Sequence, residues 1–102
     1  MRYILRFMDY HGGYSVKKKD LLLTVKTEDA AIKKAVAYAE KSDARKEKIE
    51  VTVFRAYTFD EAGKLPFSMD RKMKQISTDK ESYLCIRVGV AYKKNGKGYW
   101  MK

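Results

Sequence analysis

The chain has 102 residues, 45% of them hydrophobic, which suits one folded domain (residues 1–102) with its own core and argues against a disordered chain. The single cysteine, Cys85, excludes an internal disulfide and a thiolate metal cluster. Lys and Arg number 23 against 13 Asp and Glu, and a formal net charge of +10 favours polyanionic or acidic partners.

Two strands that form a hairpin are predicted first. Residues 2–8 alternate in polarity, and residues 21–26 are apolar and β-prone. Between them the pair Gly12-Gly13 permits positive φ, and residues 15–20 form a basic loop or an irregular strand start. The alternation groups three side chains on one face, those of Tyr3, Leu5 and Phe7.

A helix is predicted over residues 27–41. Thr27 can cap its first turn, Glu28 and Asp29 suit the positive end of the helix dipole, and Lys41 suits the negative end. Apolar residues recur at the spacing of a single helical stripe, namely Ile32, Ala35, Val36 and Ala39. This narrow apolar face predicts a helix that packs on a sheet.

A long strand over residues 49–59 follows a charged connector, residues 42–48. Its period is two, so Ile49, Val51 and Val53 point one way. The opposite set is Glu50, Thr52, Phe54, Ala56 and Thr58. The aromatic residues expected in the core are Tyr3, Phe7, Phe54 and Phe59.

The next part of the chain is less regular. Residues 60–64 are a turn around Gly63, and Pro66 excludes its neighbours from a central strand because proline lacks an N–H. Residues 68–77 form either a short helix capped by Ser68 or an ordered loop.

Two strands close the chain, over residues 83–92 and 99–101, joined through an Asn95-Gly96 hairpin turn. Cys85 lies in the first of them, where a cysteine behaves as a small buried hydrophobe. The alternating residues of that strand are Leu84, Ile86, Val88, Val90 and Tyr92. The order β-β-α-β-(short α)-β-β predicts an α+β fold, an antiparallel sheet of four to five strands with one main helix on one face.

Catalysis is not expected from this sequence. His11 is the only histidine, no nucleophile–base set accompanies it, and the helix start explains Glu28 and Asp29. No P-loop, HExxH or CxxC motif is present. We therefore predict no catalytic residue, no metal site and no cofactor. The first residues lack a signal segment and no run could span a membrane, which favours a cytoplasmic setting in a host cell interior.

Binding is favoured because basic residues gather in predicted connectors and hairpin tips, beside aromatic residues. Such a combination suits base stacking on nucleic acid, and it equally suits a protein–protein hot spot; lysines also simply occupy loops. For Tyr99 and Trp100, binding and core packing are equally favoured. The candidate partner-binding residues are Lys17, Lys18, Lys19, Arg45, Lys46, Arg71, Lys72, Lys74, Lys93, Lys94, Lys97, Tyr99 and Trp100.

The sheet face away from the helix is a second candidate, because one helix cannot cover both faces. Such a face would be basic with aromatic content, as in RNA-recognition sheets, although the strand YLCIRVGV lacks their aromatic motif. Its candidate residues are Arg2, Arg6, Phe54 and Arg87, with Lys26 and Thr52 beside them.

The stretch TVKTEDAAIKKAVAYAEK, followed later by AYKKNGKGYW, resembles small phage proteins that include anti-CRISPR inhibitors. These show a hairpin, a helix that opens in a Thr/Ser-x-x-Ala manner, and strands that end in a Lys-x-Asn/Asp-Gly-Lys hairpin. The resemblance implies a non-enzymatic, phage or mobile-element inhibitor of a host nucleic-acid machine such as a CRISPR effector, docking on an acidic protein surface or a nucleoprotein complex. It transfers no residue roles. The alternative is direct nucleic-acid binding through the lysine-rich loops and the open sheet face.

Overall fold

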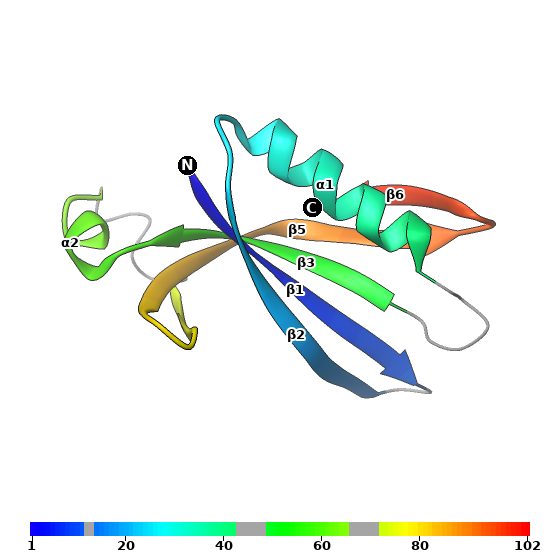
Figure 1. Cartoon of the computed structure of the whole chain (residues 1–102), viewed down its shortest axis with the longest axis horizontal. Helices are drawn as coiled ribbons and strands as arrows, with labels where there is room; N and C mark the ends of the chain where they lie inside the picture. Colours follow the sequence, from blue (N-terminus) through cyan, green and yellow to red (C-terminus); the bar gives the residue numbers. More distant parts are fainter. Residues whose placement is uncertain (12–13, 43–48, 66–71) are drawn as a thin grey trace.

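The structure is a computed structural model, and it describes residues 1–11, 14–42, 49–65 and 72–102. One main helix lies over a six-stranded antiparallel sheet (Figure 1), which confirms the predicted α+β fold. The strands are β1 (Arg2–His11), β2 (Tyr14–Thr24), β3 (Ile49–Tyr57), β4 (Lys74–Ser77), β5 (Ser82–Lys94) and β6 (Lys97–Met101). The helices are α1 (Glu28–Lys41) and α2 (Phe59–Ala62).

The strand order is β2-β1-β3-β5, and the long strand β5 holds two short partners on its far edge. Strand β4 pairs with its beginning, where Ile76 lies opposite Tyr83. Strand β6 pairs with its end through the predicted hairpin turn, in which Asn95 and Gly96 have φ of 53° and 80°. Both values lie in the left-handed region that an Asn-Gly turn requires.

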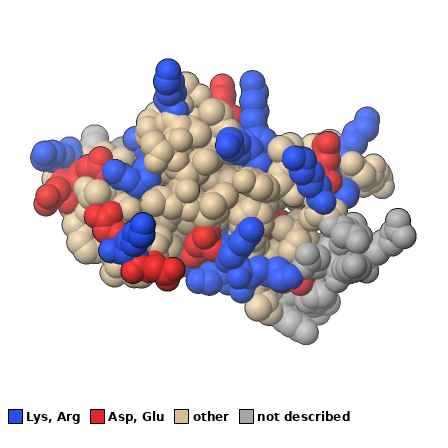
Figure 2. Space-filling view, in the orientation of Figure 1, with Lys and Arg blue, Asp and Glu red and all other residues tan. Residues whose placement is uncertain are grey.

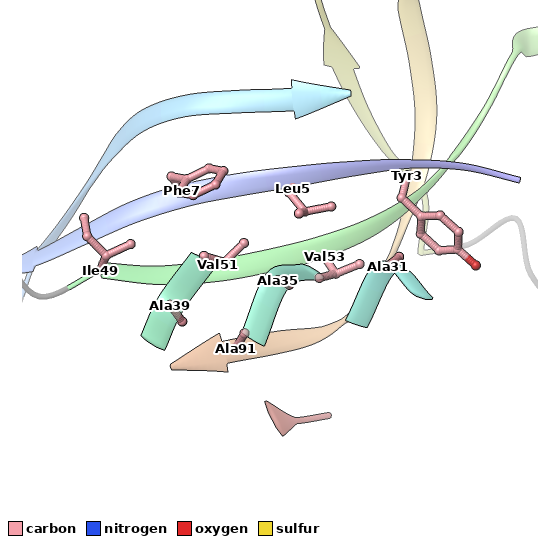
Figure 3. Close-up of a cluster of buried hydrophobic side chains, with 10 residues drawn as sticks. All are labelled: Tyr3, Leu5, Phe7, Ala31, Ala35, Ala39, Ile49, Val51, Val53 and Ala91. Carbon is pink, nitrogen blue, oxygen red and sulfur yellow. The ribbon is translucent and has the colours of Figure 1, made fainter. Parts of the chain in front are cut away.

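The main core lies between α1 and the sheet (Figure 3). As predicted, Thr27 caps the helix by accepting a hydrogen bond from the N–H of Ala30. The buried stripe differs by one position, because Ala31 and not Ile32 is buried and a small side chain there lets the helix lie close to the strands. The cluster comprises Tyr3, Leu5, Phe7, Ala31, Ala35, Ala39, Ile49, Val51, Val53 and Ala91.

A second buried cluster lies on the opposite face, toward the β4 end of the sheet. It buries Phe54, which confirms the prediction of a core position and corrects its assignment to an open face, and it buries Cys85 as expected. Its members are Ile4, Phe54, Ala56, Ile76, Tyr83 and Cys85. The face opposite α1 is therefore covered at this end.

The first hairpin is longer than predicted, because β1 continues to His11 and β2 begins at Tyr14. The ladder absorbs a register shift: Phe7 pairs with Lys19, Met8 pairs with Lys17, and the residue between the two lysines bulges. The lysines at 17–19 thus lie within an edge strand and not in a loop, a place where lysine side chains deter pairing with other chains.

The segment after β3 also differs from the prediction. Strand β3 ends at Tyr57 because Thr58 and Glu61 form a capping box that starts α2. Phe59, expected in the core, is consequently 54% exposed. Residues 74–77, predicted as part of a short helix or an ordered loop, form β4, while residues 66–71 lie outside the described part.

The predicted alternation of side chains along β5 is interrupted once. Val53 pairs with Gly89 while Phe54 pairs with Arg87, so Val88 is the extra residue of a β-bulge. After this bulge Val90 and the alternate residues that follow it point to the face opposite α1. Of the helices described, none has the length and apolar character needed to cross a membrane.

Candidate functional site

The predicted basic clusters that the structure describes do not meet on one surface. Lys17–Lys19 lie on β2, Lys72 and Lys74 lie at β4, and Lys94 and Lys97 lie at the β5–β6 turn. Figure 2 shows Lys and Arg spread over the visible side among acidic and uncharged residues. Three further candidates, Arg45, Lys46 and Arg71, lie outside the described residues.

Two of the predicted binding residues, Lys93 and Trp100, make structural contacts, and for Trp100 core packing was one of the two predicted alternatives. The Lys93 ammonium donates a hydrogen bond of 2.7 Å to the Ser42 carbonyl at the end of α1, where a cation is favoured. Trp100 lies opposite Ala91 and packs against the main core. A Cβ at Gly89 would lie 2.5 Å from the Trp100 ring, so this glycine makes room for the indole.

The face of the sheet opposite α1, here called the sheet face, is ordered by the strand register. One cross-strand row runs Asp20–Arg6–Thr52–Val90–Met101. On the next row Tyr92 lies opposite Tyr99, and their rings stack with centroids 5.7 Å apart. The exposed apolar side chains of this face include Leu22, Tyr99 and Met101. The predicted sheet face therefore exists, with Tyr99 on it and its aromatic content at the β5–β6 end.

Arg6, a predicted sheet-face residue, forms a two-pronged ion pair with Asp20. Its Nε and Nη2 lie 2.8 and 3.0 Å from the two carboxylate oxygens, and its guanidinium lies 5.8 Å from the Phe54 ring centroid. Lys17 lies 3.4 Å from the same carboxylate. Burial alone would raise the pKa of Asp20, but the hydrogen bonds and charges of Arg6 and Lys17 outweigh it and lower that pKa.

A carboxyl whose pKa is lower in the folded chain stabilises the fold above its unfolded pKa and loses that effect as pH falls through the folded value. We expect Asp20→Asn to reduce the free energy of unfolding by about 1–2 kcal/mol at pH 7, since a charged pair is lost. The difference from wild type should shrink from about pH 5 downward. Urea unfolding at several pH values measures it, with Asp79→Asn as control. A difference independent of pH would contradict the assigned pairing.

The other sheet-face candidates divide into two kinds. Arg2 donates to Glu61 at 2.8 Å and lies over the Tyr83 ring, so it fixes α2 to the sheet. The hydrogen bond from the Thr58 backbone, with that of Arg2, lowers the pKa of Glu61 to about 2.

Arg87 is exposed opposite Phe54, at the boundary between the covered and uncovered parts of the sheet face.

A surface that the sequence reasoning missed lies on the α1 side. Tyr38, 39% exposed, meets Phe7 edge-to-face at 5.3 Å. A cleft of about 440 Å³ is lined by Phe7, Lys18, Lys19, Tyr38, Lys41, Ser42 and Ile49. A hollow of about 210 Å³ is lined by Lys34, Ala37, Tyr38 and Lys41. We call the set Lys18, Lys19, Lys34, Tyr38 and Lys41 the Tyr38 surface.

A signal for half of this surface was present in the sequence. Lys34, Tyr38 and Lys41 follow the i, i+4, i+7 spacing of one helix face. Their proximity to Lys18 and Lys19 could not be predicted, because it depends on how α1 packs on the sheet, with Tyr38 against Phe7 of β1.

Arg55 was also missed. Its guanidinium lies 5.5 Å from the Tyr3 ring centroid and 4.9 Å from that of Tyr57. Its buried Nε has no hydrogen-bond partner among the described residues. Two clefts, of about 410 and 370 Å³, are lined in part by it. The Arg55 guanidinium therefore makes cation–π contacts with both tyrosine rings, and we interpret these contacts as structural.

Neither reactive groups nor known proteins assign a function. Burial raises the pKa of the Cys85 thiol to about 11, so this cysteine is not an activated nucleophile. In the described ranges, no three His, Cys, Asp or Glu residues gather as metal ligands. No protein-family model, curated protein or solved structure matches the chain.

Proposed function

We propose that this chain is a non-enzymatic binding protein, phage or mobile-element encoded, that inhibits a nucleic-acid machine inside a host cell, such as a CRISPR effector. It docks through the sheet face onto an acidic protein surface of that machine. The observation that carries the proposal is the exposed aromatic and methionine edge of the sheet face, on a chain of net charge +10.

The apolar part of this docking surface is the β5–β6 end of the sheet face. Tyr99 is 42% exposed and Met101 54% exposed, and Tyr92 supports the first by stacking. Tyrosine and methionine are enriched in protein–protein interfaces. Tyrosine buries a large area while only two torsions are ordered, and the flexible methionine adapts to an irregular surface. Helix α1 occupies the other face, so these side chains remain available for a partner.

Basic residues lie on the same face, two of them near this end. Arg87 and Lys97 are exposed, and Lys17 lies at the far strand of the same face. Charges at the rim of an interface steer association and select partners of opposite sign. An acidic protein surface is therefore the partner that complements the face.

Two features favour a protein over direct nucleic-acid binding by this face. Tyr92 and Tyr99 stack on each other, whereas RNA-recognition sheets present separate rings to successive bases. Arg6 is held by Asp20 instead of being directed at a phosphate. The described lysine clusters, the alternative from the sequence, lie apart on β2, at β4 and at the β5–β6 turn, which does not favour one continuous nucleic-acid groove.

An inhibition titration tests the proposal. A panel of purified RNA-guided nucleases, each loaded with guide RNA, should be assayed for cleavage of target DNA with increasing amounts of the chain. We expect one nuclease to be inhibited, with saturation near equimolar amounts because the inhibitor does not turn over. A basic protein of similar size serves as control. Equal inhibition by the control, or none across the panel, would contradict the proposal.

A further inference from the structure

We propose that the Tyr38 surface is a binding site for single-stranded nucleic acid, with a base stacked on the Tyr38 ring and backbone phosphates held by the surrounding lysines. This site lies on the α1 side of the molecule and is independent of the docking proposed for the sheet face. It would contact nucleic acid without reading sequence.

The aromatic part of the site is preorganised. Tyr38 projects from the C-terminal half of α1, and its edge-to-face contact with the buried Phe7 fixes the ring. Tyr38 lines both the cleft and the hollow, and it is 39% exposed. A base can therefore reach the ring, as sequence-independent binders of single strands require.

Cations line both hollows. Lys18, Lys19 and Lys41 line the cleft, and Lys34 joins Lys41 at the hollow. The Lys19 ammonium lies 4.7 Å from the Phe7 ring centroid, and this cation–π contact helps to position it beside the cleft. The cleft volume of about 440 Å³ falls within the range of small-ligand sites.

Two described negative groups at the C-terminal end of α1 are engaged elsewhere. The C-terminal carbonyls of α1 would repel a phosphate, but Ala39 accepts from the Ser42 hydroxyl at 2.7 Å and Ser42 accepts from Lys93 at the same distance. Glu40 accepts from the Gly98 N–H at 2.9 Å. No carboxylate is among the described residues that line the two hollows.

Single-stranded nucleic acid uses every part of this arrangement. A duplex keeps its bases stacked internally and would leave Tyr38 without a partner. An acidic peptide would use the lysines but not the ring. Stacking with lysine–phosphate contacts is the combination found in sequence-independent single-strand binding.

Fluorescence anisotropy with a labelled oligothymidylate of about 12 nucleotides tests the site. We expect binding at low salt that Tyr38→Ala weakens roughly tenfold and Tyr38→Phe preserves, since stacking needs only the ring. Lys19→Gln and Lys41→Gln should each make the log–log salt slope shallower by about 0.7. Lys80→Gln, an exposed lysine in the Thr78–Glu81 turn, is the matched control for charge.

Three results would overturn the proposal. The first is Tyr38→Ala binding as tightly as wild type while its melting temperature is unchanged. The second is a duplex that binds as tightly as the single strand, and the third is polyglutamate that competes as well as unlabelled oligothymidylate. Loss of inhibition in the nuclease assay bears on the sheet face alone, so the two proposals fail separately.

Discussion

Val53→Asp should lower the free energy of unfolding by about 3–5 kcal/mol, the cost of an unpaired charge in a core. Val53 is fully buried on β3 beneath α1, between Leu5 of β1 and Gly89 of β5. No described cation lies in the cluster that surrounds it. A carboxylate there must either remain uncompensated or bind a proton, and both outcomes weaken the packing of the helix on the sheet.

Urea unfolding followed by circular dichroism measures this effect. The matched control is Val16→Asp, because Val16 is a strand valine that is 52% exposed, and it should change stability by no more than about 0.5 kcal/mol. Equal losses in the two variants would show that the faces of β3 have been assigned wrongly.

Gly98→Ala should destabilise the chain by about 1–3 kcal/mol, because the added methyl overpacks a close contact between β6 and α1. A Cβ at this position would lie 2.7 Å from the Val36 carbonyl oxygen and 2.8 Å from Val36 Cγ1. The backbone oxygen cannot move without shifting the helix. The strand would have to withdraw, which also weakens the hydrogen bond from the Gly98 N–H to Glu40.

Gly63→Ala is the matched control in the same urea titration. Its added Cβ would meet nothing closer than 3.6 Å, and its φ of −64° suits any residue. It should be neutral or stabilise slightly, by reducing the entropy of the unfolded chain. A Gly98→Ala variant as stable as this control would contradict the close packing of β6 on α1.

The elements that could be predicted are those determined by residues close together in the sequence. The cap of α1 at Thr27, the Asn95-Gly96 turn and the inward face of β3 depend on neighbouring residues, and all three are confirmed. The helix α2 also had a local signal, the Thr58-x-x-Glu61 capping box, which was missed.

The remaining features depend on contacts distant in sequence. The bulge at Val88 reverses the faces of the second half of β5, and strand periodicity alone does not reveal where a bulge occurs. Lys93 donates to the Ser42 carbonyl at the end of α1 because β5 ends beside that residue. The composition of the chain could not predict this proximity. Likewise, Tyr38 lines one cleft with Lys18 and Lys19 because α1 packs on the sheet with Tyr38 against Phe7 of β1.

Two exposed tyrosines on opposite faces provide the most direct test that the sheet face carries the function. Tyr99, on the sheet face, and Tyr38, on the α1 side, have similar exposed fractions, 42% and 39%. In inhibition titrations against a nuclease that the wild-type chain inhibits, Tyr99→Ala should weaken inhibition roughly tenfold or more, as truncation of an interface hot spot does. Tyr38→Ala should stay within about twofold of wild type, the range expected for a residue outside the interface. The opposite order, or equal losses in both variants, would contradict docking through the sheet face.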